Sequence, residues 1–389
     1  MPAYWKQGLV PRKRHTVLPR KPGFRDEGIH YEEVVTRAGF SGGYSILYHL
    51  RPPTRVARVE PAGKIEIRYV DQPALRHHHL KTAAMDRQGD PISGRMPLVG
   101  NADVALSLCR PSRLESDLFR NAGADELVFV HQGRGVLETM YGTLGFTDLD
   151  YLMIPRSTTY RLEFEPGREP ILLVIESAGR LGIPPRYLNQ EGQLKLGAPF
   201  GERDLRVPEL VPAIDREDET AVLVKDGARL TRYTLAHHPF DVAGWDGMVY
   251  PYALNALDFE PITGTVHQPP PVHQTFDAEG FVVCTFAPRM LDTHPEAIKV
   301  PYAHSNIQAD ELLYYVLGRF GSRRGVESGS ITLHPRGLPH GPHPGTIVAS
   351  RDLPRTDELA VMMDTERPLG FAAAALTLDD RSYPYSWME

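Results

Sequence analysis

Short runs of β-branched and aromatic residues recur along the chain, each bounded by glycine, proline or polar residues. Examples are residues 43–48, 64–70, 127–130, 171–175 and 281–286. Apolar residues spaced for one face of a long helix are scarce. The 34 glycines and 35 prolines are spread through the sequence, and they end elements early because glycine tolerates positive φ and proline donates no backbone hydrogen bond. The pattern predicts an all-β protein, a β-sandwich or jelly roll with a few short helices.

Two segments far apart in the chain share one string of residues. NAGADELVFVHQGR begins at Asn121 and NIQADELLYYVLGR begins at Asn306, so their matched positions lie 185 residues apart. A Pro-Arg pair follows each string. We interpret the repeat as a duplicated β domain, with the first copy (core about 101–180) inside a region 1–240 and the second in 241–389.

The two copies differ at positions suited to metal chemistry. His304 and His340 occur in the second copy, where the first has Phe119 and Tyr160, and the second copy also keeps a glutamate, Glu311. Two imidazoles and one carboxylate form the ligand set of non-haem Fe(II) oxygenases, which leaves other coordination positions open. The second copy is therefore predicted to hold a catalytic metal.

The composition limits the kinds of binding partner and the cellular compartment that we expect. The formal net charge is −6, so nothing favours nucleic acid. Cys109 and Cys284 are too few for a disulfide scaffold, which suits a reducing cytoplasm. No apolar stretch has the length of a signal peptide or a membrane span, so we expect a cytoplasmic protein without membrane association.

The run His77-His78-His79 has residues typical of a metal site, but consecutive side chains point in different directions and cannot easily converge on one ion. Polar packing or an interface is the favoured interpretation.

The spacing around the predicted ligands resembles the two motifs of the cupin fold: His304-x-Asn306-x4-Glu311-x6-Gly318, and then a segment ending in His340. Three segments, HPFDVAGWDGMVYP (238–251), PYAH (301–304) and LPHGP (338–342), look like those of homogentisate 1,2-dioxygenases. The similarity is strong over residues 235–345. It implies a duplicated cupin, or bicupin, with a degenerate, metal-free first copy.

The resemblance implies that His304, Glu311 and His340 ligate Fe(II). It also implies that His267 is the active-site histidine beside the substrate hydroxyl, with His273 as the alternative. Tyr302 is expected to contact substrate.

Other positions depart from the family pattern. The acidic ligand lies one residue later than in the family, so Asp310 competes with Glu311 for the metal. Phe320 and Arg323 stand where the family places a tyrosine and a lysine near substrate, and Arg323 could clamp a carboxylate. His343 replaces an acidic residue at the substrate site. A further histidine, His334, is expected to support the ligands from behind.

The function implied by the resemblance is Fe(II)- and dioxygen-dependent opening of homogentisate (2,5-dihydroxyphenylacetate) to maleylacetoacetate, a step of tyrosine and phenylalanine catabolism, in a homo-oligomer that is a trimer or hexamer. The substituted residues Phe320 and Arg323 keep a related hydroquinone-type acid open as the substrate. A non-catalytic metal-binding bicupin is the alternative from another class.

Overall fold

The computed structural model describes residues 3–20, 27–39, 41–70, 72–321 and 323–388. Its regular structure is almost entirely β, which confirms the predicted fold class. The one α-helix among these residues is α1 (Thr346–Ser350), and the other helices are short 3₁₀ turns such as η5 (Pro270–His273) and η7 (Tyr383–Met388). None of the described helices has the length and apolar character to cross a membrane.

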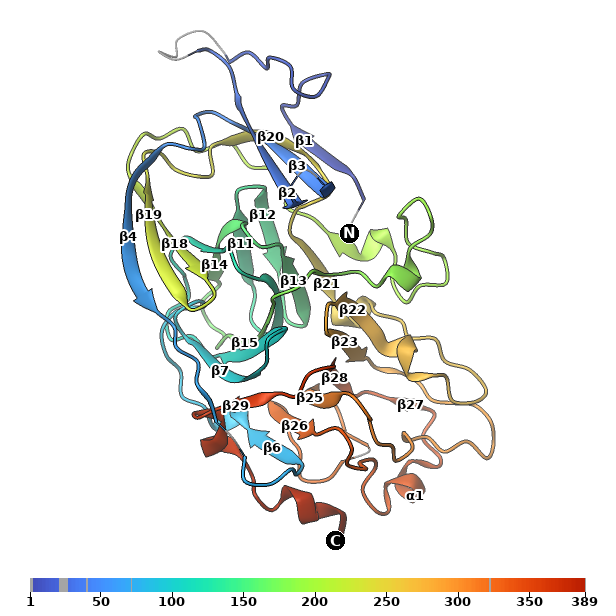
Figure 1. Ribbon diagram of the computed structural model, residues 1–389. Helices are drawn as coiled ribbons and strands as arrows, with labels where there is room; N and C mark the ends of the chain where they lie inside the picture. The colour runs from blue at the N-terminus through green and yellow to red at the C-terminus, as the bar shows by residue number, and fades with distance from the viewer. Residues whose placement is uncertain (1–2, 21–26, 40, 71, 322, 389) are drawn as a thin grey trace.

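Two large sheets contain the same run of five strands (Figure 1). In the nine-stranded sheet the run is β13 (Asp150–Ile154), β10 (Asp125–Gln132), β15 (Ile171–Ser177), β8 (Val104–Cys109) and β7 (Arg95–Gly100). In the seven-stranded sheet it is β26 (Ser330–His334), β25 (Asp310–Leu317), β28 (Leu359–Thr365), β23 (Phe281–Phe286) and β22 (Gln274–Ala278). Each run is antiparallel throughout, so the duplication seen in the sequence is a duplication of the fold.

The two copies exchange strands at their sheet edges. β6 (His78–Lys81) pairs with β26 in the second copy, and β21 (Tyr252–Asn255) pairs with β13 in the first. The smaller end strands are β29 (Gly370–Ala372) and β5 (Tyr69–Val70) beside β7, β17 (Leu205–Arg206) beside β21, and β16 (Leu181–Gly182) beside β22. Such strands cover edges that would otherwise expose unpaired backbone groups. A strand from before residue 240, β6, thus pairs within the second copy, and a strand from after it, β21, pairs within the first.

A second sheet closes the first barrel. Its strands are β12 (Gly142–Phe146), β11 (Gly135–Thr139), β14 (Thr159–Phe164), β9 (Phe119–Asn121), β18 (Thr220–Asp226), β19 (Arg229–Leu235) and β4 (Val56–Lys64). The run expected at 64–70 is split, because β4 ends at Lys64 and β5 starts at Tyr69.

Outside the barrels lies a four-stranded sheet of β1 (Trp5–Gly8), β20 (Val242–Gly247), β3 (Ser41–His49) and β2 (Tyr31–Ala38). In the second barrel the side facing the predicted ligands is formed by loops and the short pair β24 (Arg289–Met290) and β27 (Arg355–Thr356).

The two large sheets pack against each other through a shared apolar core. Leu127 of β10 and Leu312 of β25 both belong to this core and are fully or almost fully buried, and each such side chain contributes roughly 2–3 kcal/mol on burial. Side chains alternate between the two faces of a strand. Glu311, one residue before Leu312, therefore points to the opposite face, into the second barrel.

Candidate metal centre

The structure brings together the three predicted ligands of the second barrel. His304 Nε2 lies 3.3 Å from Glu311 Oε2, and His340 Nε2 lies 3.3 Å from Glu311 Oε1. One donor atom from each side chain lies within 4.8 Å of the other two. This compact set of two imidazoles and a carboxylate could hold one divalent ion.

The backbone fixes the two histidines as a pair. His304 and His340 form an isolated antiparallel bridge, with N–H···O distances of 2.8 and 2.9 Å, and their ring centroids lie 4.3 Å apart. Their Nδ1 atoms lie 3.3 and 3.2 Å from the carbonyl oxygens of Tyr302 and Leu338. An Nδ1–H that donates to these carbonyls leaves both Nε2 atoms as ligands.

One buried atom in this set has no hydrogen bond. His340 Nε2 is buried, and although it lies 3.3 Å from Glu311 Oε1 it forms no hydrogen bond of regular geometry with a described residue. A buried polar atom without a partner is costly, and a metal ion would supply the missing interaction. The donor types and this atom together fit a divalent metal such as Fe(II).

His334 supports Glu311 from behind. Its Nδ1 lies 2.9 Å from Glu311 Oε1, its Nε2 lies 3.1 Å from the Tyr383 hydroxyl, and its ring stacks on His340 at 4.5 Å. Burial lowers the pKa of His334 to about 3, so the ring is neutral. Although burial opposes it, hydrogen bonds from the surrounding histidines hold the pKa of Glu311 well below its usual value.

Asp310, the alternative ligand, is occupied elsewhere. Its Oδ1 accepts from the Arg336 backbone N–H at 2.9 Å and its Oδ2 from that of Leu369 at 2.8 Å. The equivalent residue of the first copy, Asp125, accepts from the Arg156 N–H at the same distance of 2.9 Å. Asp310 therefore stabilises the Pro-Arg turn, and the geometry favours Glu311 for the metal.

A cavity of about 170 Å³ lies beside the cluster and is lined by His304 and Glu311. Three predicted substrate-site residues also line it: Tyr302, His267 and His273. The exposed His267 ring packs 5.2 Å from the Tyr302 ring, and burial lowers the pKa of His273 to about 3. Both histidines reach the cavity, so the choice between them stays open.

The other predicted substrate residues lie outside the lining of this cavity. Arg323 donates to the Gly341 carbonyl and lies 5.9 Å from the Trp387 ring. Phe320 packs against Tyr315 at 4.8 Å. The third residue, His343, is buried, stacks on Trp387 at 4.5 Å and bonds to Ser386 Oγ at 2.7 Å. Their roles toward substrate remain predictions.

Four charged residues of the cavity were missed by sequence reasoning: Arg289, Asp292, Lys299 and Asp364. Asp364 pairs with Glu311 across the sheet, and its buried Oδ1 has no hydrogen-bond partner in the described part of the chain. Burial raises the pKa of Asp364 to about 7. Extending the repeat would have found it, since Glu176 pairs with Glu126 in the same way. The two cations lie in loops and short strands that the repeat does not cover.

The sequence model of a family described as "Homogentisate 1,2-dioxygenase N-terminal" matches residues 55–256, more than half of the chain. The chain belongs to the homogentisate 1,2-dioxygenase family. A relative from Saccharolobus solfataricus, "Putative dioxygenase SSO1533", is 40% identical over 99% of this chain and 98% of its own length. The homogentisate 1,2-dioxygenase of Rhodopseudomonas palustris is 26% identical, over 69% of this chain and 62% of its own length, so that match spans less than two thirds of the relative.

Similar solved structures include a cupin 2 conserved barrel domain protein from Leptotrichia buccalis, with a TM-score of 0.34 and 9% identity over 78% of this chain and 99% of its own. Oxalate decarboxylase from Bacillus subtilis has a TM-score of 0.35 and 11% identity over 76% of this chain and 78% of its own. At these scores the likeness carries no argument about function.

In this family member the first barrel carries a cation of its own at the equivalent position. Arg95 donates to Glu126 Oε1 at 2.5 Å and to the Tyr160 hydroxyl at 3.0 Å, and it lies 5.6 Å from the Phe119 ring centre. Phe119 and Tyr160 stand where the second copy has its two histidine ligands. The guanidinium thus neutralises the buried glutamate of a copy that lacks the imidazoles.

The histidine run is dispersed, as expected from its sequence. His78 lies 3.2 Å from Asp379 Oδ2 and His79 lies 2.8 Å from Ser330 Oγ. The His77 ring packs 5.3 Å from His334. The three side chains do not converge.

Proposed function

We propose that the protein is an Fe(II)- and dioxygen-dependent dioxygenase that opens the ring of homogentisate to give maleylacetoacetate. The observation that carries the proposal is the convergence of His304, Glu311 and His340 beside a cavity, in a chain of this family. A metal-binding protein without catalytic activity would not need a cavity beside the metal ligands. This cavity is lined by two cations, Arg289 and Lys299, and by two further histidines.

His304, Glu311 and His340 would hold the iron. When bound, Fe(II) supplies open coordination positions at which a phenol and dioxygen can meet. His334 keeps the Glu311 carboxylate in one orientation through the 2.9 Å contact, and Tyr383 keeps His334 in place. A metal site depends on such supporting contacts for its geometry.

The cavity residues bind and orient the substrate. Arg289 and Lys299 offer positive charge for the side-chain carboxylate, and a guanidinium can grip a carboxylate through two parallel hydrogen bonds. His267 accepts the proton of a ring hydroxyl, with Asp292 3.7 Å from its Nδ1 to orient the ring; His273 is the alternative. Apolar neighbours such as Met362 exclude water.

A related hydroquinone-type acid is a second candidate substrate. The relative that spans nearly the whole chain is named only as a dioxygenase, whereas the relatives named for homogentisate match about two thirds of it. The metal ligands and the cavity serve either acid, so the two candidates differ in substrate and share the site.

The test is oxygen consumption by the full chain loaded anaerobically with Fe(II), using homogentisate, gentisate and unsubstituted hydroquinone. We expect uptake of one dioxygen per homogentisate, with the ultraviolet absorbance of a ring-opened product. Faster uptake with another acid would transfer the assignment to that acid. Iron-loaded protein that consumes no oxygen with any of them would contradict an enzymatic role and favour a metal-binding bicupin.

A further inference from the structure

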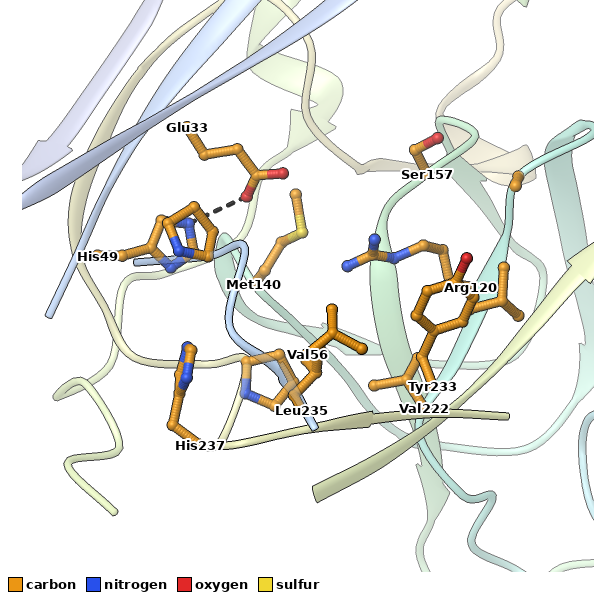
Figure 2. Close-up of a pocket in the computed structure, with 14 residues that line it drawn as sticks. Glu33, His49, Val56, Arg120, Met140, Ser157, Val222, Tyr233, Leu235 and His237 are labelled. Atoms are coloured by element: carbon orange, nitrogen blue, oxygen red, sulfur yellow. Dashed lines mark hydrogen bonds and ion pairs between the residues drawn. The ribbon is translucent and has the colours of Figure 1, made fainter. Parts of the chain in front are cut away.

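A cavity of about 300 Å³ lies far from the metal centre in the fold, between the hairpin β2–β3 and the closing sheet of the first barrel (Figure 2). It shares no lining residue with the metal pocket. Its volume is within the range of small-molecule sites. Two of its lining residues, His237 and Pro239, belong to or adjoin the segment 238–251 that marks the family but does not approach the metal ligands.

Arg120 of β9 supplies a positive charge to the cavity, where Glu33, another lining residue, attracts it. Its Nε and Nη2 both donate to Thr159 Oγ1, at 2.8 and 2.6 Å. No carboxylate in the described part of the chain comes within ion-pairing distance of it. Figure 2 shows the guanidinium pointing across the cavity toward Met140. Burial lowers the pKa of Arg120, although the charge of Glu33 partly opposes this shift.

The acidic residue of the cavity is already paired. Glu33 accepts from His49 Nε2 at 3.1 Å, and His49 Nδ1 lies 2.7 Å from Asp241 Oδ1. Although burial opposes it, the hydrogen bonds to Asp241 and Glu33 raise the pKa of His49 to about 9, so this imidazole is charged. Glu33 and Asp241 share the charged His49 on this wall, and Arg120 faces the cavity from the opposite side.

A second polar group also lacks a partner. His237 is 1% exposed, lines the cavity, and its buried Nδ1 has no hydrogen-bond partner among the described residues. Its Nε2 lies 3.6 Å from Asp241 Oδ2. A buried nitrogen without a partner at the wall of a cavity is free to form a hydrogen bond with a bound molecule.

The remaining lining is largely apolar: Pro53, Val56, Ala122, Met140, Val222, Val224, Leu235 and Pro239. We infer that this cavity is a second ligand site that binds a small organic monocarboxylate, its carboxylate on Arg120 and its apolar body against Met140 and Val222. A carboxylate matches the planar guanidinium. The apolar body of the ligand covers apolar side chains of the cavity that water would hydrate poorly. The site is independent of the proposed dioxygenase reaction.

Isothermal titration of the full, iron-free chain with phenylacetate tests the inference, with phenylacetamide as the uncharged analogue. In a chain that carries Arg289→Leu, so that the metal pocket lacks its carboxylate-binding arginine, we expect one phenylacetate per chain. Binding of the amide, or of phenylacetate after the added change Arg120→Met, should be about tenfold weaker, because a lost charge-assisted pair is worth at least 1.4 kcal/mol. The matched control is Arg232→Met, an exposed arginine on β19, which should leave affinity unchanged.

Two further variants keep the result decisive. Val56→Trp enlarges a partly exposed side chain at the cavity wall without touching Arg120, and it should weaken binding even if Arg120→Met fails to fold. Arg289→Leu removes the carboxylate-binding arginine of the metal pocket, so phenylacetate binding that this variant retains belongs to the second cavity. Absence of binding at millimolar phenylacetate, binding that survives both Arg120→Met and Val56→Trp, or binding lost in Arg289→Leu would each overturn the inference.

Discussion

The internal cation of the first barrel gives a prediction about stability. Arg95 and Glu126 are 9% and 1% exposed, and their ion pair is completed by the Tyr160 hydroxyl, which donates to Glu126 Oε2 at 2.5 Å. Arg95→Met leaves a buried carboxylate without its positive partner, which costs about 3–5 kcal/mol. For a chain of 389 residues that corresponds to a fall in Tm of roughly 4–6 °C.

The double variant Arg95→Met/Glu126→Gln separates the charge from the packing. Removing both charges should regain most of the lost Tm, because an apolar or neutral pair avoids the desolvation cost of both ions. Arg113→Met is the matched control: this arginine is 66% exposed and pairs with Asp90, so its loss should cost no more than about 1 kcal/mol. Thermal unfolding followed by circular dichroism measures all three. An unchanged Tm for Arg95→Met, or a double variant no better than the single one, would refute the reasoning.

Three further predictions concern the ligand, the substrate clamp and pH. Glu311→Gln should abolish Fe(II) binding at nearly unchanged Tm, whereas Asp310→Asn should lower Tm and keep the iron; the reverse pattern by metal analysis would make Asp310 the ligand. Arg289→Leu should raise the KM for homogentisate about tenfold, and Arg323→Leu should raise it less. The opposite order would indicate that Arg323 binds the substrate carboxylate. His49 has its pKa raised to about 9, so its stabilisation is fully present below its unfolded value near 6.5 and is lost as pH rises through about 9, a change of about 3 kcal/mol. Unfolding at pH 7 and pH 10 should show this loss in the parent and not in His49→Gln, and equal losses in both would contradict it.

The fold could be predicted where the sequence repeats. The strings at Asn121 and Asn306 contain β10 and β25, and the strands around them follow in the same order in both sheets. The exchanged edge strands could not be predicted, because a short strand such as β6 (His78–Lys81) carries no signal for the distant β26 that it pairs with.

The three proposed metal ligands could be found in the sequence for the same reason. Comparing the copies isolates His304 and His340 as the substituted positions, and the fold brings both to Glu311. Arg95 was missed because it lies on β7, outside the matched strings. Arg289 was missed because loops and short strands around the metal pocket differ between the copies, and loop residues are placed by tertiary contacts that local sequence does not encode.

We propose that two histidines and one glutamate of the second barrel bind ferrous iron. The most direct measurement is the iron content of anaerobically loaded and desalted protein, for the parent chain and for His304→Ala and His340→Ala, each verified as folded. We expect one iron per parent chain and almost none in either variant. Iron retained by both folded variants, or a folded parent that takes up none, would contradict it.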